Sequence, residues 1–158
     1  MGSNRRGRHG APEREVAAAL AAIPGQVASA PIMSSAPVGP SIRRFANTAA
    51  VVETALSPRD LLRELKAIER RLGRRSGRRW GARVADLDII LWSGGTYRAR
   101  ELTIPHPAFR TRDFVLRPIT NVAPHWRDPI SGQTIRQLHA RLTRRRPLPR
   151  RSGAGAGP

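Results

Sequence analysis

The chain has 158 residues, a length that suits one domain with a core of its own. It contains no cysteine, which excludes disulfides, thiolate metal sites and thiol catalysis. Its formal net charge of +18 is of the kind that attracts nucleic acids or anionic membranes, although much of it lies near the two ends of the chain, and no apolar run is long enough to span a bilayer.

The first third of the chain predicts one helix and two strands. Pro12 and two early glutamates favour a helix over about residues 12–23, which Pro24-Gly25 ends. Residues 26–33 and 45–54 are typical of strands, and the segment between them, which contains Pro and Gly, predicts a loop.

The clearest helix of the chain begins at Ser57, which can cap it, with Pro58 at its first position. Apolar residues recur on one face until Gly73 ends the helix. An arginine-rich loop over residues 74–83 follows, and it leads into a strand predicted for residues 84–92.

The remaining part of the chain predicts shorter elements. Residues 102–107 are expected to be extended, residues 114–116 to form a short strand, and residues 134–142 to form a last helix. Residues 143–158 are basic and rich in Pro and Gly, so we expect a disordered tail after a single domain over residues 1–142. Strands that alternate with helices predict an α+β sandwich, in which helices pack on a mostly antiparallel sheet.

Two carboxylates stand on one face of the strand predicted for residues 84–92. Successive side chains of a strand alternate between its faces, so Asp86 and Asp88 point the same way, ~7 Å apart, while Leu87 and Ile89 point into a core. Carboxylates at this separation can hold one or two Mg²⁺ ions, and the arginines just upstream can clamp the phosphates that such ions carry. The pattern therefore predicts phosphate-transfer chemistry.

Three longer motifs accompany these carboxylates. They are Arg-Trp-Gly-x-Arg-x-x-Asp-Leu-Asp-Ile-Ile-Leu at residues 79–91, Leu-x-Ile-Pro-His-Pro at residues 102–107 and Arg-x-Phe-Val-Leu-x-Pro at residues 112–118. Together with Gly2-Ser3-Asn4 they closely resemble the 6-hydroxymethyl-7,8-dihydropterin pyrophosphokinases, over about residues 2–142. The resemblance implies a ferredoxin-like α/β sandwich and transfer of pyrophosphate from MgATP to the pterin alcohol in folate biosynthesis. It implies ATP and the pterin as partners, and two Mg²⁺ ions brought with ATP.

The resemblance also implies which residues hold the nucleotide. Asp86 and Asp88 match the two Mg²⁺ ligands of the family. Arg74 and Arg83 match arginines that contact the triphosphate, and we expect a catalytic role for them because charge spreads onto the transferring group. The other positions that match the ATP side are Leu62, Lys66, Glu69, Ile89, Thr103, His106 and Arg112.

A flat pterin needs aromatic faces and amide-type groups at its edge. Phe45 and Phe114 match the stacking pair of the family, Asn47 matches its edge-reading asparagine, and Trp80 matches a tryptophan of the loop that closes over the pterin. The remaining positions that match the pterin side are Ser35, Ala36 and Val38.

The sequence departs from the pattern of the family in a few places. Its first residues fall just after the family's first strand, so we expect that strand to be truncated. Ala36 and Ala82 stand where proline is usual, which makes both loops less rigid.

Two alternatives remain open from the sequence. A basic nucleic-acid-binding module would explain the arginines, but it gives no reason for two carboxylates on one strand face. The other alternative is a protein that keeps the fold of this family and has lost its activity. We favour an active enzyme, and we expect a cytoplasmic monomer that binds neither nucleic acid nor membrane.

Overall fold

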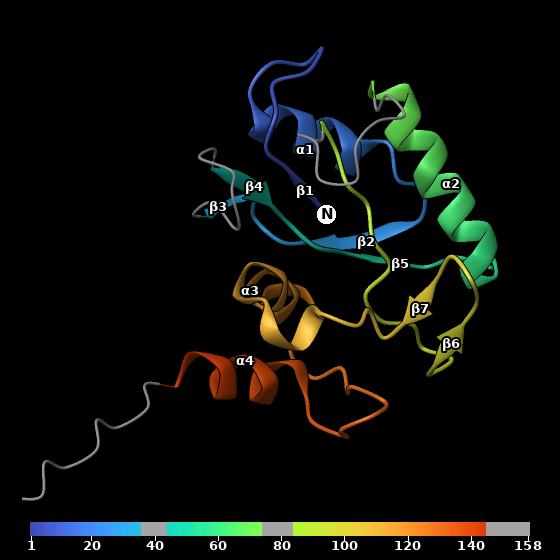
Figure 1. The fold of residues 1–158 in the computed structure, drawn as a ribbon, viewed down its shortest axis with the longest axis vertical. Coiled ribbons are helices and arrows are strands. Elements are labelled where there is room, and N and C mark those ends of the chain that lie inside the picture. The colour runs from blue at the N-terminus through green and yellow to red at the C-terminus, as the bar shows by residue number, and fades with distance from the viewer. Residues whose placement is uncertain (36–43, 74–83, 145–158) are drawn as a thin grey trace, which may run out of the picture.

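The computed structural model describes residues 1–35, 44–73 and 84–144. Its elements are β1 (Gly2–Ser3), α1 (Pro12–Ala21), β2 (Gln26–Ser29), β3 (Met33–Ser35), β4 (Phe45–Asn47), β5 (Ala50–Val52), α2 (Pro58–Arg71), β6 (Tyr97–Arg98), β7 (Thr103–Ile104), the 3₁₀ helix η1 (Phe109–Thr111), α3 (Asp113–Val122) and α4 (Ile135–Thr143). The mixed α+β class is confirmed (Figure 1). The loop predicted for residues 74–83 and nearly all of the predicted tail lie outside the described residues.

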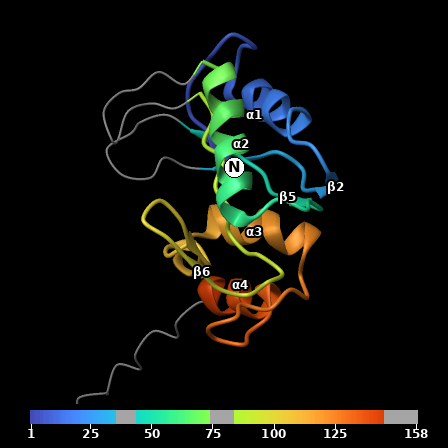
Figure 2. The same ribbon diagram turned by 90° about the vertical axis from the view of Figure 1, so that its right-hand side faces the viewer.

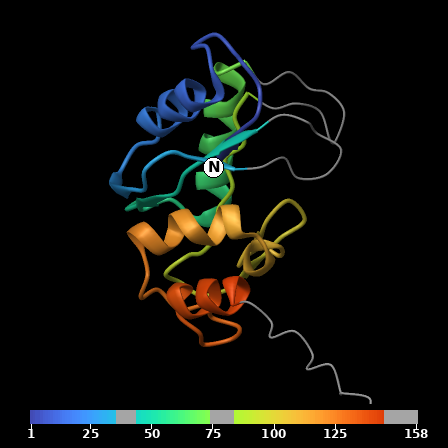
Figure 3. The same ribbon diagram turned by 90° about the vertical axis from the view of Figure 1, so that its left-hand side faces the viewer.

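The helices lie on both sides of a central layer of strands. Helices α1 and α2 cover one side of β2 and β5, and α3 covers the other side (Figures 2 and 3). Helix α4 packs on α3, on the side away from the strands. Within the described residues, no helix is both long and apolar enough to cross a membrane.

The strands are short and all their pairings are antiparallel. They form one three-stranded sheet in the order β1-β4-β3 and two hairpin-like pairs, β2-β5 and β6-β7. Each of the two long strands predicted for the first third of the chain is broken in two. Pro31 has no N–H to give to a ladder, which interrupts the first, and the second breaks at Thr48, whose hydroxyl donates to Ala30 O at 2.6 Å.

The predicted helix boundaries agree well with the structure. The hydroxyl of Ser57 accepts a hydrogen bond from Asp60 N at 3.2 Å, and Thr134 forms a capping box with Gln137 at the start of α4. Both caps depend only on residues close together in the chain, which is why the sequence pattern predicts where these helices begin.

The short strand predicted for residues 114–116 is wrong, because this segment belongs to helix α3. Leu116, Ile119 and Ala123 are buried together, and their spacing of three and four residues is that of a helix face. The strand predicted for residues 84–92 is extended chain in which Asp86 alone forms a ladder bridge to another strand, to Gly2.

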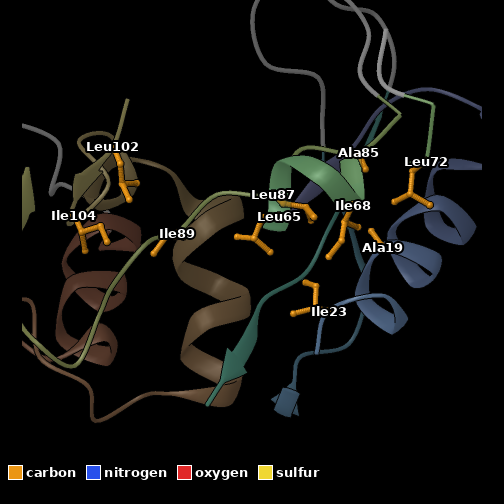
Figure 4. Close-up of a cluster of buried hydrophobic side chains, with 10 residues drawn as sticks. All are labelled: Ala19, Ile23, Leu65, Ile68, Leu72, Ala85, Leu87, Ile89, Leu102 and Ile104. Atoms are coloured by element: carbon orange, nitrogen blue, oxygen red, sulfur yellow. The ribbon is translucent and has the colours of Figure 1, made fainter. Parts of the chain in front are cut away.

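The main core lies between α1, α2 and the extended chain around Leu87 and Ile89 (Figure 4). Leu87 is 1% exposed and Ile89 is 9% exposed, which confirms that these two side chains point into the core. A second cluster joins η1, α3 and α4, and its buried members are Phe109, Leu116, Ile119, Ala123, Ile135 and Leu138.

Candidate active site

The segment that carries the two predicted metal ligands is attached to β1 through its backbone. Gly2 N donates to Asp86 O at 3.0 Å, and Asp86 N donates to Gly2 O at 2.9 Å. The side chain of Asp86 is 28% exposed and Asp88 is exposed, so both carboxylates are open to a ligand while Leu87 between them is buried.

Helix α2 holds the backbone of Leu87 from the core side. Oε1 of Glu69 accepts from Leu87 N at 2.7 Å, and Nζ of Lys66 donates to Leu87 O at 3.1 Å. Lys66 also forms an ion pair with Glu69 at 2.7 Å and lies 4.0 Å from Asp86 Oδ1. Because Glu69 is fully buried, this arrangement fixes the peptide groups on either side of Leu87.

The carboxylates fit a hard divalent cation in their chemistry. Asp86 and Asp88 offer oxygen ligands only, the type that Mg²⁺ prefers. Among the described residues, no group of three or more His, Cys, Asp or Glu side chains is placed to hold a metal ion. A cation at this pair would therefore take further oxygen ligands from water or from a phosphorylated ligand, as Mg²⁺ commonly does.

His106 is oriented by its own backbone and by a neighbouring amide. The main-chain N–H of His106 donates to Ile90 O at 3.0 Å, and the ring Nδ1 accepts from the main-chain N–H of Ala108 at 3.3 Å. Burial lowers the pKa of His106, Asp88 partly opposes this shift, and Arg112 adds to it. The neutral ring then carries its proton on Nε2, a donor suited to a phosphate oxygen.

Arg112 and Phe114 flank the first residue of helix α3. The Arg112 guanidinium lies over the Phe114 ring, 5.8 Å from its centre. Arg112 is exposed and Phe114 is half-buried, so both side chains have surface that a ligand can reach. The pair places one residue predicted for the nucleotide beside one predicted for the pterin.

Three residues predicted for the pterin lie together on β3 and β4. Ser35 is paired with Phe45 in the ladder, and Asn47 Nδ2 donates to Ser35 Oγ at 2.8 Å. Asn47 is almost fully buried, so this bond fixes the direction of its amide. Helix α3, which carries Phe114, contacts β4.

Gly2 was not predicted as a site residue, but it shapes this part of the site. It is paired with Asn47 in the β1–β4 ladder, and a Cβ atom at Gly2 would come 2.8 Å from Asn47 Oδ1. Glycine is therefore needed for the side chain of Asn47 to lie where it does. The signal in the sequence was the Gly-Ser-Asn motif, which gave no role for the glycine.

The other sequence-predicted positions are less closely grouped. Leu62 is half-buried on α2, Thr103 is exposed on β7, and the side chain of Ile89 lies in the core. The remaining predicted residues lie outside the described part of the chain: Ala36, Val38, Arg74, Trp80 and Arg83.

A mostly apolar cavity of about 520 Å³ lies between β5 and residues 87–93. Asp88 and Ile89 contribute to its wall, whereas Phe45 and Asn47 do not. This cavity is therefore separate from the residues predicted for the pterin.

Comparison with known proteins gives one family. The model of the family described as 7,8-dihydro-6-hydroxymethylpterin-pyrophosphokinase matches residues 1–124. This range includes the carboxylate segment, His106 and the start of α3.

Curated relatives carry the name 2-amino-4-hydroxy-6-hydroxymethyldihydropteridine pyrophosphokinase. One from Synechocystis sp. is 43% identical over 100 residues, which cover 63% of this chain and 51% of the relative. One from Methylorubrum extorquens is 40% identical over 98 residues, 62% of this chain and 61% of the relative. One from Pseudomonas aeruginosa is 41% identical over 115 residues, 72% of this chain and 70% of the relative. The chain thus spans about half the length of the first of these relatives.

Proposed function

The chain belongs to the 7,8-dihydro-6-hydroxymethylpterin-pyrophosphokinase family, and we propose on this basis that it transfers pyrophosphate from MgATP to 6-hydroxymethyl-7,8-dihydropterin. The products are AMP and the pterin diphosphate, a step of folate biosynthesis. The observation that carries the proposal is the carboxylate pair of partly exposed Asp86 and exposed Asp88, whose intervening residue Leu87 is fixed by helix α2.

At the nucleotide end, Asp86 and Asp88 would hold the two Mg²⁺ ions that arrive with ATP, and these ions would supply positive charge to the phosphate oxygens. His106 donates from Nε2 to a phosphate oxygen, and Arg112 adds positive charge beside it. The family assigns further nucleotide contacts to Leu62, Lys66, Glu69, Ile89 and Thr103, which we include in the proposal.

At the pterin end, Phe45 and Phe114 offer aromatic faces to the flat ring. Asn47 presents its amide to the polar edge of the pterin, held in place by its bond to Ser35. Placement of the ring between these groups brings its hydroxymethyl arm toward the nucleotide, which is the main requirement for transfer between two bound substrates.

The reaction is an in-line displacement at the β-phosphorus. The hydroxymethyl oxygen forms a bond to this phosphorus, the bond to the α-phosphate oxygen breaks, and AMP leaves with the electron pair. The hydroxyl proton passes to water. The rate enhancement comes from the positioning of the two substrates and from stabilisation of the charge that develops in the transition state, as in other phosphoryl transfers.

Residues outside the described ranges complete the proposal. Arg74 and Arg83 act on the triphosphate as the catalytic arginines, and Trp80, Ala36 and Val38 contact the pterin. We further propose a ferredoxin-like arrangement of the α+β fold, a single domain over residues 1–142, and a monomer in the cytoplasm.

A direct assay tests the function. Incubation of the protein with ATP, MgCl₂ and 6-hydroxymethyl-7,8-dihydropterin should form AMP in step with the pterin diphosphate. A folded protein that binds both substrates and forms no AMP would support the alternative of a lost activity. The family match gives no support to a nucleic-acid-binding module.

A further inference from the structure

Arg112 lies between two residues that are tied to the last part of the chain. On one side, Arg110 donates to both carboxylate oxygens of Asp128, at 2.8 Å from Nε and 2.5 Å from Nη2. On the other side, His139 Nε2 donates to Asp113 Oδ1 at 2.9 Å. Asp128 and His139 both lie beyond residue 124, where the match to the family model ends.

The tie between Arg110 and Asp128 is buried at its carboxylate end, while the Arg110 side chain is 27% exposed. Asp128 has no exposed surface, and it also accepts from Ile130 N and from the N–H and hydroxyl of Ser131. Burial alone would raise the pKa of Asp128, but the bonds from Arg110 and Ser131 outweigh it and lower the pKa to about 2. The carboxylate is therefore ionised at neutral pH, where a bidentate pair with arginine is strong and directional.

The second tie acts on the first turn of helix α3. No side chain caps the start of this helix, and its first residue is Asp113. Asp113 is bonded to His139 of α4, whose side chain is 22% exposed, and to Arg117 one turn along, whose side chain is 58% exposed. The bond to His139 is less exposed to solvent than the bond to Arg117, and it joins two helices. It therefore does more to fix the orientation of the first turn of α3.

Apolar packing holds η1, α3 and α4 together, and such packing has little directional preference of its own. The hydrogen bonds of Arg110 to Asp128 and of His139 to Asp113 add direction at residues 110 and 113, on either side of Arg112 and next to Phe114. The helices involved lie side by side in all three views (Figures 1, 2 and 3).

We propose that Asp128 and His139 are positioning residues that hold Arg112 and Phe114 at the angle needed to bind the nucleotide and the pterin. The proposal rests on the proposed function, because it takes these two residues as ligand contacts. It assigns a role in the site to a segment that the family match does not reach.

His139 gives the cleaner test, since Asp128 is fully buried and its removal affects folding. We would compare His139→Ala, His139→Gln and the control His125→Ala, which removes an exposed histidine. Dissociation constants for the pterin and for a non-hydrolysable MgATP analogue would be measured by calorimetry, and the melting temperature recorded for each variant.

His139→Ala should weaken binding of both ligands about tenfold, because small misplacements of contact residues are costly. His139→Gln should restore the affinities, since the glutamine amide can donate to Asp113 as Nε2 does. The control should bind as the wild type does. Restored binding in the glutamine variant at an unchanged melting temperature would show positioning rather than general stability.

A double variant makes the test independent of overall stability. Asp113→Ala combined with His139→Ala should weaken binding no more than Asp113→Ala alone, because the bond between the two residues is already lost in that single variant. Additive losses, or equal losses in the alanine and glutamine variants, would overturn the proposal, as would unchanged binding in His139→Ala. A wild-type protein that binds neither ligand would overturn the proposed function and this role with it.

Discussion

The Oε1 atom of Glu69 accepts a hydrogen bond from the main-chain N–H of Leu87 at 2.7 Å. This contact joins helix α2 to the segment that presents both candidate metal ligands, 18 residues further along the chain. It explains why the segment from Asp86 to Asp88 keeps its alternation of faces although it is not part of a continuous ladder. The main-chain N–H and carbonyl of Leu87 are bonded to side chains of α2 instead of to a neighbouring strand.

Replacement of Glu69 by alanine should therefore damage both stability and metal-dependent binding. It leaves the buried N–H of Leu87 without its acceptor, which costs about 1–3 kcal/mol in the free energy of unfolding. The affinity for an MgATP analogue should fall, because Asp86 and Asp88 are no longer held on one face. Urea unfolding and calorimetry would measure the two effects.

Two matched variants of the same helix sharpen this prediction. Glu69→Gln keeps an oxygen that can accept from Leu87 N. It should therefore lose less stability and less affinity for the MgATP analogue than Glu69→Ala. Glu64→Ala removes an exposed glutamate of α2 and should change neither quantity. If Glu69→Ala bound the MgATP analogue as tightly as Glu64→Ala, the contact to Leu87 would not be what positions the carboxylates.

Asn47 should act on the pterin alone. Asn47→Ala removes the amide that is fixed by Ser35, so the affinity for the pterin should fall about tenfold or more, since a hydrogen bond to a ligand is lost in a buried setting. Binding of the nucleotide analogue should be unchanged. The control is Asn121→Ala, an exposed asparagine of α3. An equal loss for both ligands would mean that Asn47 only supports the fold.

Gly2 should affect pterin binding through the side-chain amide of Asn47. A Cβ atom added by Gly2→Ala would come 2.8 Å from Asn47 Oδ1, closer than real contacts allow, so the amide must turn away. We expect Gly2→Ala to weaken pterin binding in the wild type, as measured by fluorescence titration. In the Asn47→Ala background it should have little further effect, and a full additional loss would contradict this mechanism.

The parts of this account that the sequence predicts are those with local causes. The cap at Ser57 and the period of the apolar residues predict helix α2, and the alternation of a strand predicts that Leu87 and Ile89 face the core while Asp86 and Asp88 do not. These features depend only on residues close together in the chain.

The parts that the sequence does not predict depend on distant contacts. A three-residue apolar run at residues 114–116 is compatible with a strand, and only burial against α4 shows that it begins a helix. The role of Glu69 as an acceptor for Leu87, and that of His139 as a donor to Asp113, join elements whose relative placement no local pattern reports.

The ion pair of Asp128 predicts a specific dependence of stability on pH. The pKa of Asp128 is lowered from its ordinary 3.8 to about 2 by Arg110 and Ser131, against the effect of burial. A carboxyl group with a lowered pKa stabilises the folded state above its ordinary pKa, and this contribution is lost as the pH falls toward the lowered value. The contribution is about 2 kcal/mol for a shift of this size.

Urea unfolding of the wild type and of Asp128→Asn between pH 6 and pH 2 measures how much the ionised carboxylate of Asp128 contributes to the free energy of unfolding. The wild type should be the more stable protein at pH 6, and the difference in the free energy of unfolding should narrow by about 2 kcal/mol as the pH falls from about 4 to 2. A difference that stays constant over this range would show that the charge of Asp128 does not stabilise the fold.

The central claim is that Asp86 and Asp88 support transfer of a pyrophosphoryl group to a pterin alcohol. The most direct measurement follows ATP labelled in its γ-phosphate, with MgCl₂ and 6-hydroxymethyl-7,8-dihydropterin, in the wild type and in Asp88→Asn. The wild type should release unlabelled AMP and place the label in the pterin diphosphate, while folded Asp88→Asn should be at least about 100-fold slower. Formation of ADP in place of AMP, or an Asp88→Asn variant as fast as the wild type, would contradict the claim.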